Sequence, residues 1–204
     1  DSEFTDPTGT GRVHMFKGLG SSISASTPTG DSLWGSAAEL AKYDLIALPC
    51  YSYPTNATTA TQDKQRIFDY AGLGGRVFVT DLSYPVIQAG PAPWPTTANW
   101  NAGGAFSNPG LIDTSFPKGD ALAKWLQAIG ATTTLGQVTI NNTYVRFSAV
   151  NPPAQRWLYS AGAPQTFSFN TPMGVDPKDQ CGRVAYSSFH IANGAPASTF
   201  PTEC

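Results

Sequence analysis

The sequence predicts an α/β fold with a mainly parallel β-sheet. Residues 43–50, 76–80 and 182–190 each form an apolar run of strand length. A helical pattern over residues 59–71, followed by Gly74 and Gly75, links the first run to the second, so these parts form a βαβ unit with a right-handed crossover. Runs of this kind are typical of strands buried on both faces of a parallel sheet. We therefore expect all three runs to be parallel and adjacent in one sheet.

Helical patterns also lie at residues 31–40 and 120–129, each with one apolar side. Residues 12–16 form a short apolar run that fits a further strand. From residue 135 to residue 169 apolar residues alternate with polar ones in short runs, including 138–140 and 145–147. This alternation predicts an antiparallel β meander added to one side of the sheet.

Residues 85–118 interrupt the pattern with a long excursion rich in proline and aromatic residues. Trp94, Trp100 and Phe106 alternate there with six prolines. A loop of this length in a compact domain is usually functional or packed against the surface, and its aromatic residues argue against disorder. These rings could stack on sugars or dock a protein partner, or they could simply pin the loop.

The composition indicates one exported domain over residues 1–204. Charged residues make up 13% of the chain, about half the usual share, and Gly, Pro, Ser, Thr and Asn take their place. The formal net charge of −2 predicts no nucleic-acid partner, and no apolar run is long enough to span a membrane. The chain starts at Asp1 without a methionine, so we expect a mature segment of a longer precursor, located outside the cell or on its surface.

The order of these segments resembles the class I glutamine-amidotransferase-like superfamily, and its trehalose-utilisation-type branch most. More narrowly, the chain is similar to an uncharacterised domain of large exported bacterial proteins. The most specific segments are residues 48–50 (Leu-Pro-Cys), 74–80, 111–119 and 181–184. The resemblance implies a flavodoxin-like three-layer sandwich, here with the β meander added. It also implies a nucleophile just after strand 76–80 and a histidine at the end of strand 182–190.

His190 fits the histidine position, whereas Asp81 occupies the neighbourhood where the family's glutaminases carry cysteine. A carboxylate cannot perform thioester chemistry, which needs a low-pKa thiolate. The acidic residue that the family places two positions after the histidine is also absent, because Ala192 stands there. We therefore expect no glutaminase activity. We also expect no catalytic metal or other cofactor, because the chain has only two histidines and Asp81 with His190 would supply two ligands where catalytic zinc needs three.

The residues leave two classes of function open. One is a non-catalytic binding or structural module of an exported bacterial protein, with Tyr84, Trp94 and Trp100 as candidate binding residues. Its partner would be a protein, a carbohydrate or the rest of its own precursor. The other is a hydrolase that uses Asp81, Ser83 and His190 at the C-terminal edge of the sheet. An open cleft with Asp81 or Ser83 in reach of His190 favours the hydrolase, and a cleft filled by Tyr84 or Trp94 favours the binding module.

Three cysteines predict one disulfide and one free thiol. Cys50 ends its strand and Cys181 precedes its own, so parallel pairing places them at opposite edges of the sheet, about 20 Å apart. A disulfide needs Cα atoms within about 7 Å, which excludes a bond between these two. We expect Cys50–Cys204, with Cys181–Cys204 as the alternative.

Overall fold

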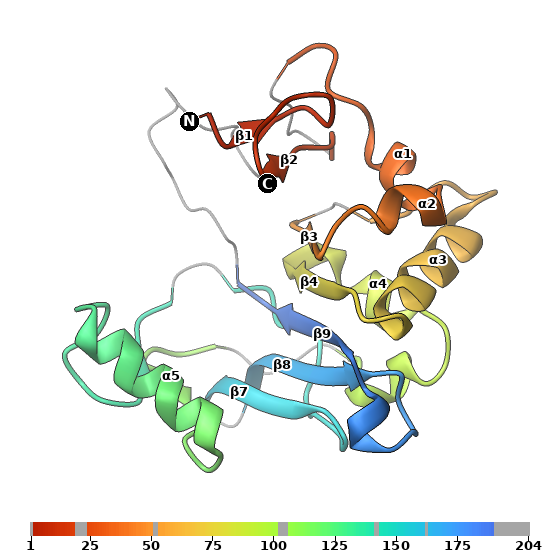
Figure 1. Cartoon of the computed structure of the whole chain (residues 1–204). Helices are drawn as coiled ribbons and strands as arrows, with labels where there is room; N and C mark the ends of the chain where they lie inside the picture. Colours follow the sequence, from red (N-terminus) through yellow and green to blue (C-terminus); the bar gives the residue numbers. More distant parts are fainter. Residues whose placement is uncertain are drawn as a thin grey trace.

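The computed structural model describes residues 2–18, 24–50, 53–101, 106–140, 143–161 and 163–189. Within these ranges the main sheet has seven strands in the order β3-β4-β9-β8-β7-β5-β6. Figure 1 labels the first five of them, from β3 to β7. Their bounds are β3 Leu45–Leu48, β4 Arg76–Thr80, β5 Gly110–Ile112, β6 Gln137–Val138, β7 Gln155–Ser160, β8 Ala163–Thr171 and β9 Gly182–Ser187. A separate small sheet pairs β1 (Phe4–Thr5) with β2 (Val13–His14).

The three apolar runs form neighbouring parallel strands, as the sequence predicts. Strand β3 pairs in parallel with β4, and β4 pairs in parallel with β9. The register places Leu45 beside Arg76 and Arg76 beside Arg183. The predicted arrangement of this half of the sheet is therefore confirmed.

The prediction of a mainly parallel, flavodoxin-like three-layer sandwich is wrong. Strands β9 and β8, β8 and β7, β7 and β5, and β5 and β6 all pair antiparallel, so only two of the six neighbouring pairs in the described sheet are parallel. The reason is that the β meander does not form a small addition. It joins the same sheet through β9 and supplies the larger number of strand pairs.

The meander itself differs in detail from the prediction. Strands β6, β7 and β8 lie within or close to residues 135–169, but residues 145–147 form no strand. Phe147 is instead fully buried in the main core. The predicted run 12–16 shortens to the two residues of β2, which pair with β1 and not with the main sheet.

The helical patterns are mostly confirmed. Helix α3 spans Ala60–Gly72 and α5 spans Pro117–Ala128. The pattern over residues 31–40 forms two helices, α1 (Gly30–Trp34) and α2 (Ala37–Leu40), because Gly35 ends the first and the Ser36 side chain caps the second by accepting a hydrogen bond from the Glu39 backbone N–H. The excursion contains strand β5, helix α4 (Pro85–Gln88) and the 3₁₀ turn η2 (Trp94–Thr97). Two further 3₁₀ turns, η1 (Asp81–Ser83) and η3 (Pro177–Asp179), follow β4 and precede β9.

Helices lie on both faces of the sheet, but at opposite ends. The side chains of Ile46, Val77 and Val184 point to one face, where the main core includes residues of α1 to α4. Helix α5 packs instead with Ile112 of β5 and Leu158 of β7 in a second cluster. The register places Leu158 opposite Thr166, and Thr166 opposite Ser187. Thr166 and Ser187 are each next in sequence to a main-core residue, Phe167 and Tyr186, so these positions and Leu158 belong to the other face of the sheet. Figure 1 shows α5 at the β7 end and α1 to α3 at the β3 end.

Trp94 is central to the main core. Its side chain is 1% exposed, and its ring centroid lies 5.2 Å from that of Phe68 on α3 and 5.7 Å from that of Phe169 on β8. The excursion is therefore held down by a tryptophan that connects a helix to the sheet.

We expect Trp94→Ala to lower the free energy of unfolding by about 3–5 kcal/mol, because it removes a fully buried ring and leaves a cavity. Trp125→Ala is the matched control, since Trp125 is 56% exposed, and we expect it to change that free energy by less than about 1 kcal/mol. Urea unfolding followed by far-ultraviolet circular dichroism measures both. Equal losses in the two variants would contradict the placement of Trp94 in the core.

Candidate functional site

The turn after β4 has unusual backbone geometry. Asp81 begins η1 with a φ of +46°, a left-handed conformation that is uncommon for residues other than glycine. Its side chain is 1% exposed, and its carbonyl oxygen accepts a hydrogen bond from the Tyr186 hydroxyl at 3.0 Å. Left-handed residues of this kind are held in place by their surroundings and are common at functional sites. This turn stands directly after β4, which is the position where the sequence predicts a nucleophile.

Ser83 lies in the same turn but is not presented to solvent. It is fully buried, and its hydroxyl donates a hydrogen bond to the carbonyl oxygen of Pro49 at the end of β3. His190 lies outside the described residues, so its pairing with Asp81 or Ser83 stays a prediction. Burial of both Asp81 and Ser83 is the opposite of what a nucleophile in an open cleft requires.

Aromatic rings fill the space beside this turn. The Trp100 ring stacks on Tyr84 with centroids 6.1 Å apart and also lies 6.0 Å from Tyr186. The Arg146 guanidinium lies over the Tyr84 ring at 5.4 Å and over the Tyr144 ring at 3.6 Å. Of the candidate binding residues, Trp94 is buried in the core, Tyr84 packs against Trp100, and Trp100 also packs against three rings of the core.

A second candidate surface lies on the sheet itself, on the face opposite helices α1 to α4. Two rows of side chains point to this face. The first contains Leu45, Arg76, Arg183 and Asn170, and the second contains Ala47, Phe78, Ala185 and Ser168. Apart from the buried Ser168, all of these residues are exposed or half-buried. Among the described residues no helix covers this part of the face, and we call its six positions on β3, β4 and β9 the uncovered face: Leu45, Ala47, Arg76, Phe78, Arg183 and Ala185.

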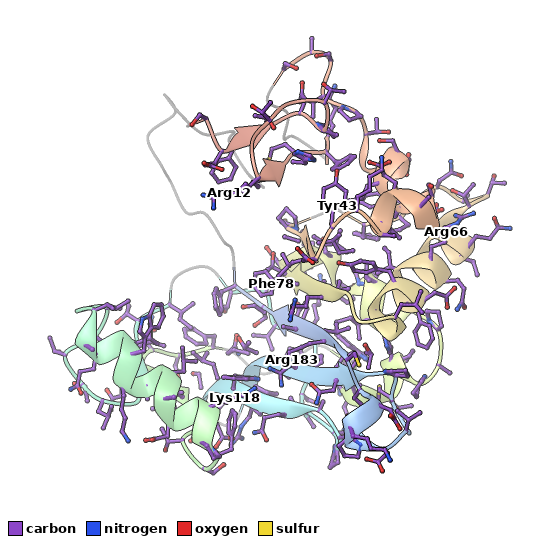
Figure 2. The ribbon with its side chains drawn as sticks, in the orientation of Figure 1. Arg12, Tyr43, Arg66, Phe78, Lys118 and Arg183 are labelled. Carbon is purple, nitrogen blue, oxygen red and sulfur yellow. The ribbon has the colours of Figure 1, made fainter. Side chains whose placement is uncertain are left out.

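An open face on parallel strands is unusual. Parallel sheets occur almost only where both faces are covered, whereas antiparallel sheets commonly leave one face in water. Leu45 is 53% exposed although it is a large apolar residue in a strand. Figure 2 shows Phe78 and Arg183 in the part of the sheet between α5 and the α1–α3 group.

The charge on the uncovered face is positive. Arg76 and Arg183 are adjacent in register, and within the described part of the chain neither has an ion-pair partner. The Nε atom of Arg183 donates a hydrogen bond to the side-chain oxygen of Asn170 at 3.3 Å. The face therefore combines a central aromatic ring with two cations.

The sequence carried a signal for this face that the prediction missed. Strands buried on both faces read as continuous apolar runs, but β4 begins Arg-Val-Phe-Val and β9 begins Gly-Arg-Val-Ala. Arg76 and Arg183 stand at equivalent positions, one residue before Val77 and Val184. Such matched charges at alternate positions indicate one exposed face.

The described residues contain no cluster of three or more His, Cys, Asp or Glu side chains that could hold a metal ion. None of the helices in the described ranges has the length and apolar character needed to cross a membrane.

Comparison with known proteins gives little further information. No protein-family model and no curated protein matches the sequence. Among the solved structures that match is one described as a cytoplasmic protein from Salmonella typhimurium. It has a TM-score of 0.47 and 11% sequence identity, and the alignment covers 85% of this chain and 74% of that chain. A likeness this weak carries no argument about fold or activity.

The extracellular location expected from the composition is corrected here. The expectation depended on the low content of charged residues and on a first residue other than methionine, and neither feature is a physical requirement of export. We therefore withdraw it.

The environment of the turn after β4 predicts a pH dependence of stability. Burial, reinforced by the nearby Asp81 carboxylate, raises the pKa of Tyr186 far above its ordinary value. In the unfolded chain a tyrosine ionises near pH 10. Above about pH 10 the unfolded state therefore loses a proton that folded Tyr186 keeps, and the free energy of unfolding falls as the pH rises.

We expect Tyr186→Phe to lose less stability between about pH 9 and pH 11 than the unmodified chain, by up to about 1.4 kcal/mol per pH unit above pH 10. Thermal unfolding over this range measures the difference. Tyr144→Phe is the control, because Tyr144 is an exposed tyrosine. An unchanged slope in Tyr186→Phe would show that this hydroxyl does not control alkaline unfolding.

The cysteines give a second prediction. Cys181 is a free, exposed thiol, whereas buried Cys50 is not free. Cys204 lies outside the described residues, and we propose that it pairs with Cys50. Such a bond would stabilise the fold by about 2–4 kcal/mol.

Alkylation without reduction, followed by peptide mapping, tests this pairing. We expect alkylation of Cys181 alone and a cross-linked peptide that contains Cys50 and Cys204. Alkylation of all three cysteines would contradict the proposal.

Proposed function

We propose that this chain is a non-catalytic protein-binding module whose docking surface is the uncovered face of β3, β4 and β9. The observation that carries the proposal is the exposure of Leu45 and the partial exposure of Phe78 and Ala185 on parallel strands, where a second layer of structure normally lies. The partner supplies that layer. Because helices are the usual cover for parallel strands, the expected partner element is an amphipathic helix.

The charges on this face specify the partner further. Arg76 and Arg183 lie side by side without an ion pair in the described part of the chain. A partner helix with acidic residues beside its apolar stripe would place carboxylates against these guanidinium groups, which pair well with carboxylates. Phe78 lies in the next row of the face, beside Ala185, and would form the apolar centre of the contact. This charge complementarity favours a protein partner over a neutral carbohydrate.

The turn at Asp81 supports the non-catalytic part of the proposal. We retain the resemblance to glutamine amidotransferases as a proposal in which Asp81 stands at a former nucleophile position. A left-handed residue directly after a buried strand is the backbone geometry that a nucleophile needs to project from a sheet. A buried carboxylate at that position, next to a buried Ser83 that donates to a backbone carbonyl, offers no accessible nucleophile.

A designed helical peptide tests the docking surface. We expect the intact chain to bind an 18-residue peptide with a leucine stripe flanked by glutamates at least about tenfold more tightly than the same peptide with lysines in place of the glutamates. Phe78→Glu should weaken binding of the glutamate peptide by about tenfold or more, since it puts a charge at the apolar centre. Fluorescence anisotropy of the labelled peptides measures both effects.

Leu73→Glu is the matched control, because Leu73 is a leucine that is 89% exposed outside the uncovered face. It should bind the glutamate peptide as the unmodified chain does. Equal binding of the two peptides, or equal binding by Phe78→Glu, would refute the proposed surface. Circular dichroism of Phe78→Glu confirms that the variant is folded.

A further inference from the structure

Strand β3 forms one edge of the seven-stranded sheet, and its outer side has no strand partner among the described residues. The backbone N–H of Arg76 donates to the carbonyl oxygen of Asp44, so Asp44, Ile46 and Leu48 direct their backbone groups toward β4. Leu45 and Ala47 consequently direct theirs outward. Within the described part of the chain these outward groups have no backbone hydrogen bond.

A groove of about 570 Å³ runs along this edge. One side of it is β3 with its flanking residues 44–49, and the other is the extended segment 12–18. Helix α1 contributes Leu33 and Trp34 to its lining. The segment 12–18 therefore faces the free edge across a gap and does not pair with it, because β2 within this segment pairs with β1.

The lining of the groove is mostly apolar, with a few charged residues. Its charged residues are Arg12, Lys17, Lys42 and Asp44. Arg12 and Lys42 form ion pairs with Glu3 and Glu39, but the described residues contain no ion-pair partner for Lys17. An acidic side chain on an occupant would therefore be favoured near Lys17.

We propose that this groove binds an extended peptide segment of another protein, which adds to the sheet as a strand beside β3. The outward N–H and C=O groups of Leu45 and Ala47 supply the main-chain hydrogen bonds, and this is the mode of recognition in which an exposed sheet edge takes up a strand. The occupant carries apolar side chains at alternate positions and an acidic one near Lys17. This site goes beyond the proposed helix-binding function, since it uses the backbone of β3 and the groove and not the side chains of Phe78, Arg76 and Arg183.

A library of random ten-residue peptides displayed on phage, selected against the intact chain, provides the probe. We expect Ala47→Pro to weaken binding of the selected peptides about tenfold, because proline removes the outward N–H while the bonds between β3 and β4 remain. Ala47→Val is the matched control, since it keeps the N–H and has good strand propensity, and it should bind within about threefold of the unmodified chain. Lys17→Glu should weaken the binding of peptides that carry an acidic residue.

Hydrogen exchange gives a test that does not depend on how well Ala47→Pro folds. On binding of a selected peptide, the amides of Leu45 and Ala47 should exchange at least about tenfold more slowly. The amides of Gln137 and Val138 on β6, the strand at the opposite edge, should be unchanged. N-methylation of one alternating set of peptide amides should abolish binding and N-methylation of the other set should not, because only every second amide of an added strand donates to β3.

Three outcomes would overturn the proposal. One is that no peptide is selected, and a second is that selected peptides leave the exchange of Leu45 and Ala47 unchanged. The third is binding that is lost in Phe78→Glu but kept in Ala47→Pro, which would support docking on the uncovered face and reject strand addition. If Ala47→Pro loses the selected peptides but binds the helical peptide normally, the result supports strand addition at a site separate from the uncovered face.

Discussion

Strand β9 is the element on which the rest of the sheet depends, because it pairs in parallel with β4 and antiparallel with β8. Its first residue, Gly182, permits the close approach of α3, since a Cβ atom there would lie 1.9 Å from the carbonyl oxygen of Ala71. The Thr171 hydroxyl donates a hydrogen bond to that same oxygen at 2.6 Å. Any larger residue at position 182 would push α3 away from the point where the two halves of the sheet meet.

The far end of β9 fixes the turn after β4. Tyr186 is fully buried, and its hydroxyl bonds to the carbonyl oxygen of Asp81, which holds the left-handed turn in place. The ring centroids of Phe147, which lies in a loop, and of Phe167 on β8 are within 5.7 Å of the Tyr186 ring centroid. One strand thus connects α3, the turn and the antiparallel half. The turn where catalysis was expected is tightly packed, whereas the outer edge of β3, two strands from β9, has no strand partner among the described residues.

The sequence predicted the local elements better than the architecture. Continuous hydrophobicity identified the three parallel strands, and the periodicity identified α3 and α5. The periodicity also covered α1 and α2 but did not resolve the break, although Gly35-Ser36 is a clear stop and cap signal. The meander was recognised but not its place in the main sheet, because strand pairing between distant segments leaves little trace in a single sequence.

The candidate site shows the same limit. The position of Asp81 directly after a predicted strand indicated a special residue, and its backbone is indeed left-handed. Its burial, and that of Ser83 and Trp94, could not be predicted, because burial depends on which distant rings pack over the turn. The uncovered face was predictable from Arg76 and Arg183, whose matched positions contradict burial on both sides. The interpretation of these strands as fully buried gave too much weight to the valines between the charges.

The two proposed surfaces have a common physical origin in β3. Leu45 and Ala47 present their backbone groups to the groove and their side chains to the uncovered face, so one strand leaves both main-chain and apolar interactions unmade. Natural proteins usually protect such an edge with charges, bulges, proline or a covering element, and the central residues of β3, Ile46 and Ala47, include none of these. The segment 12–18 lies nearby but pairs elsewhere. The two proposed surfaces therefore meet at β3, and a partner with a strand followed by a helix could use both surfaces at once.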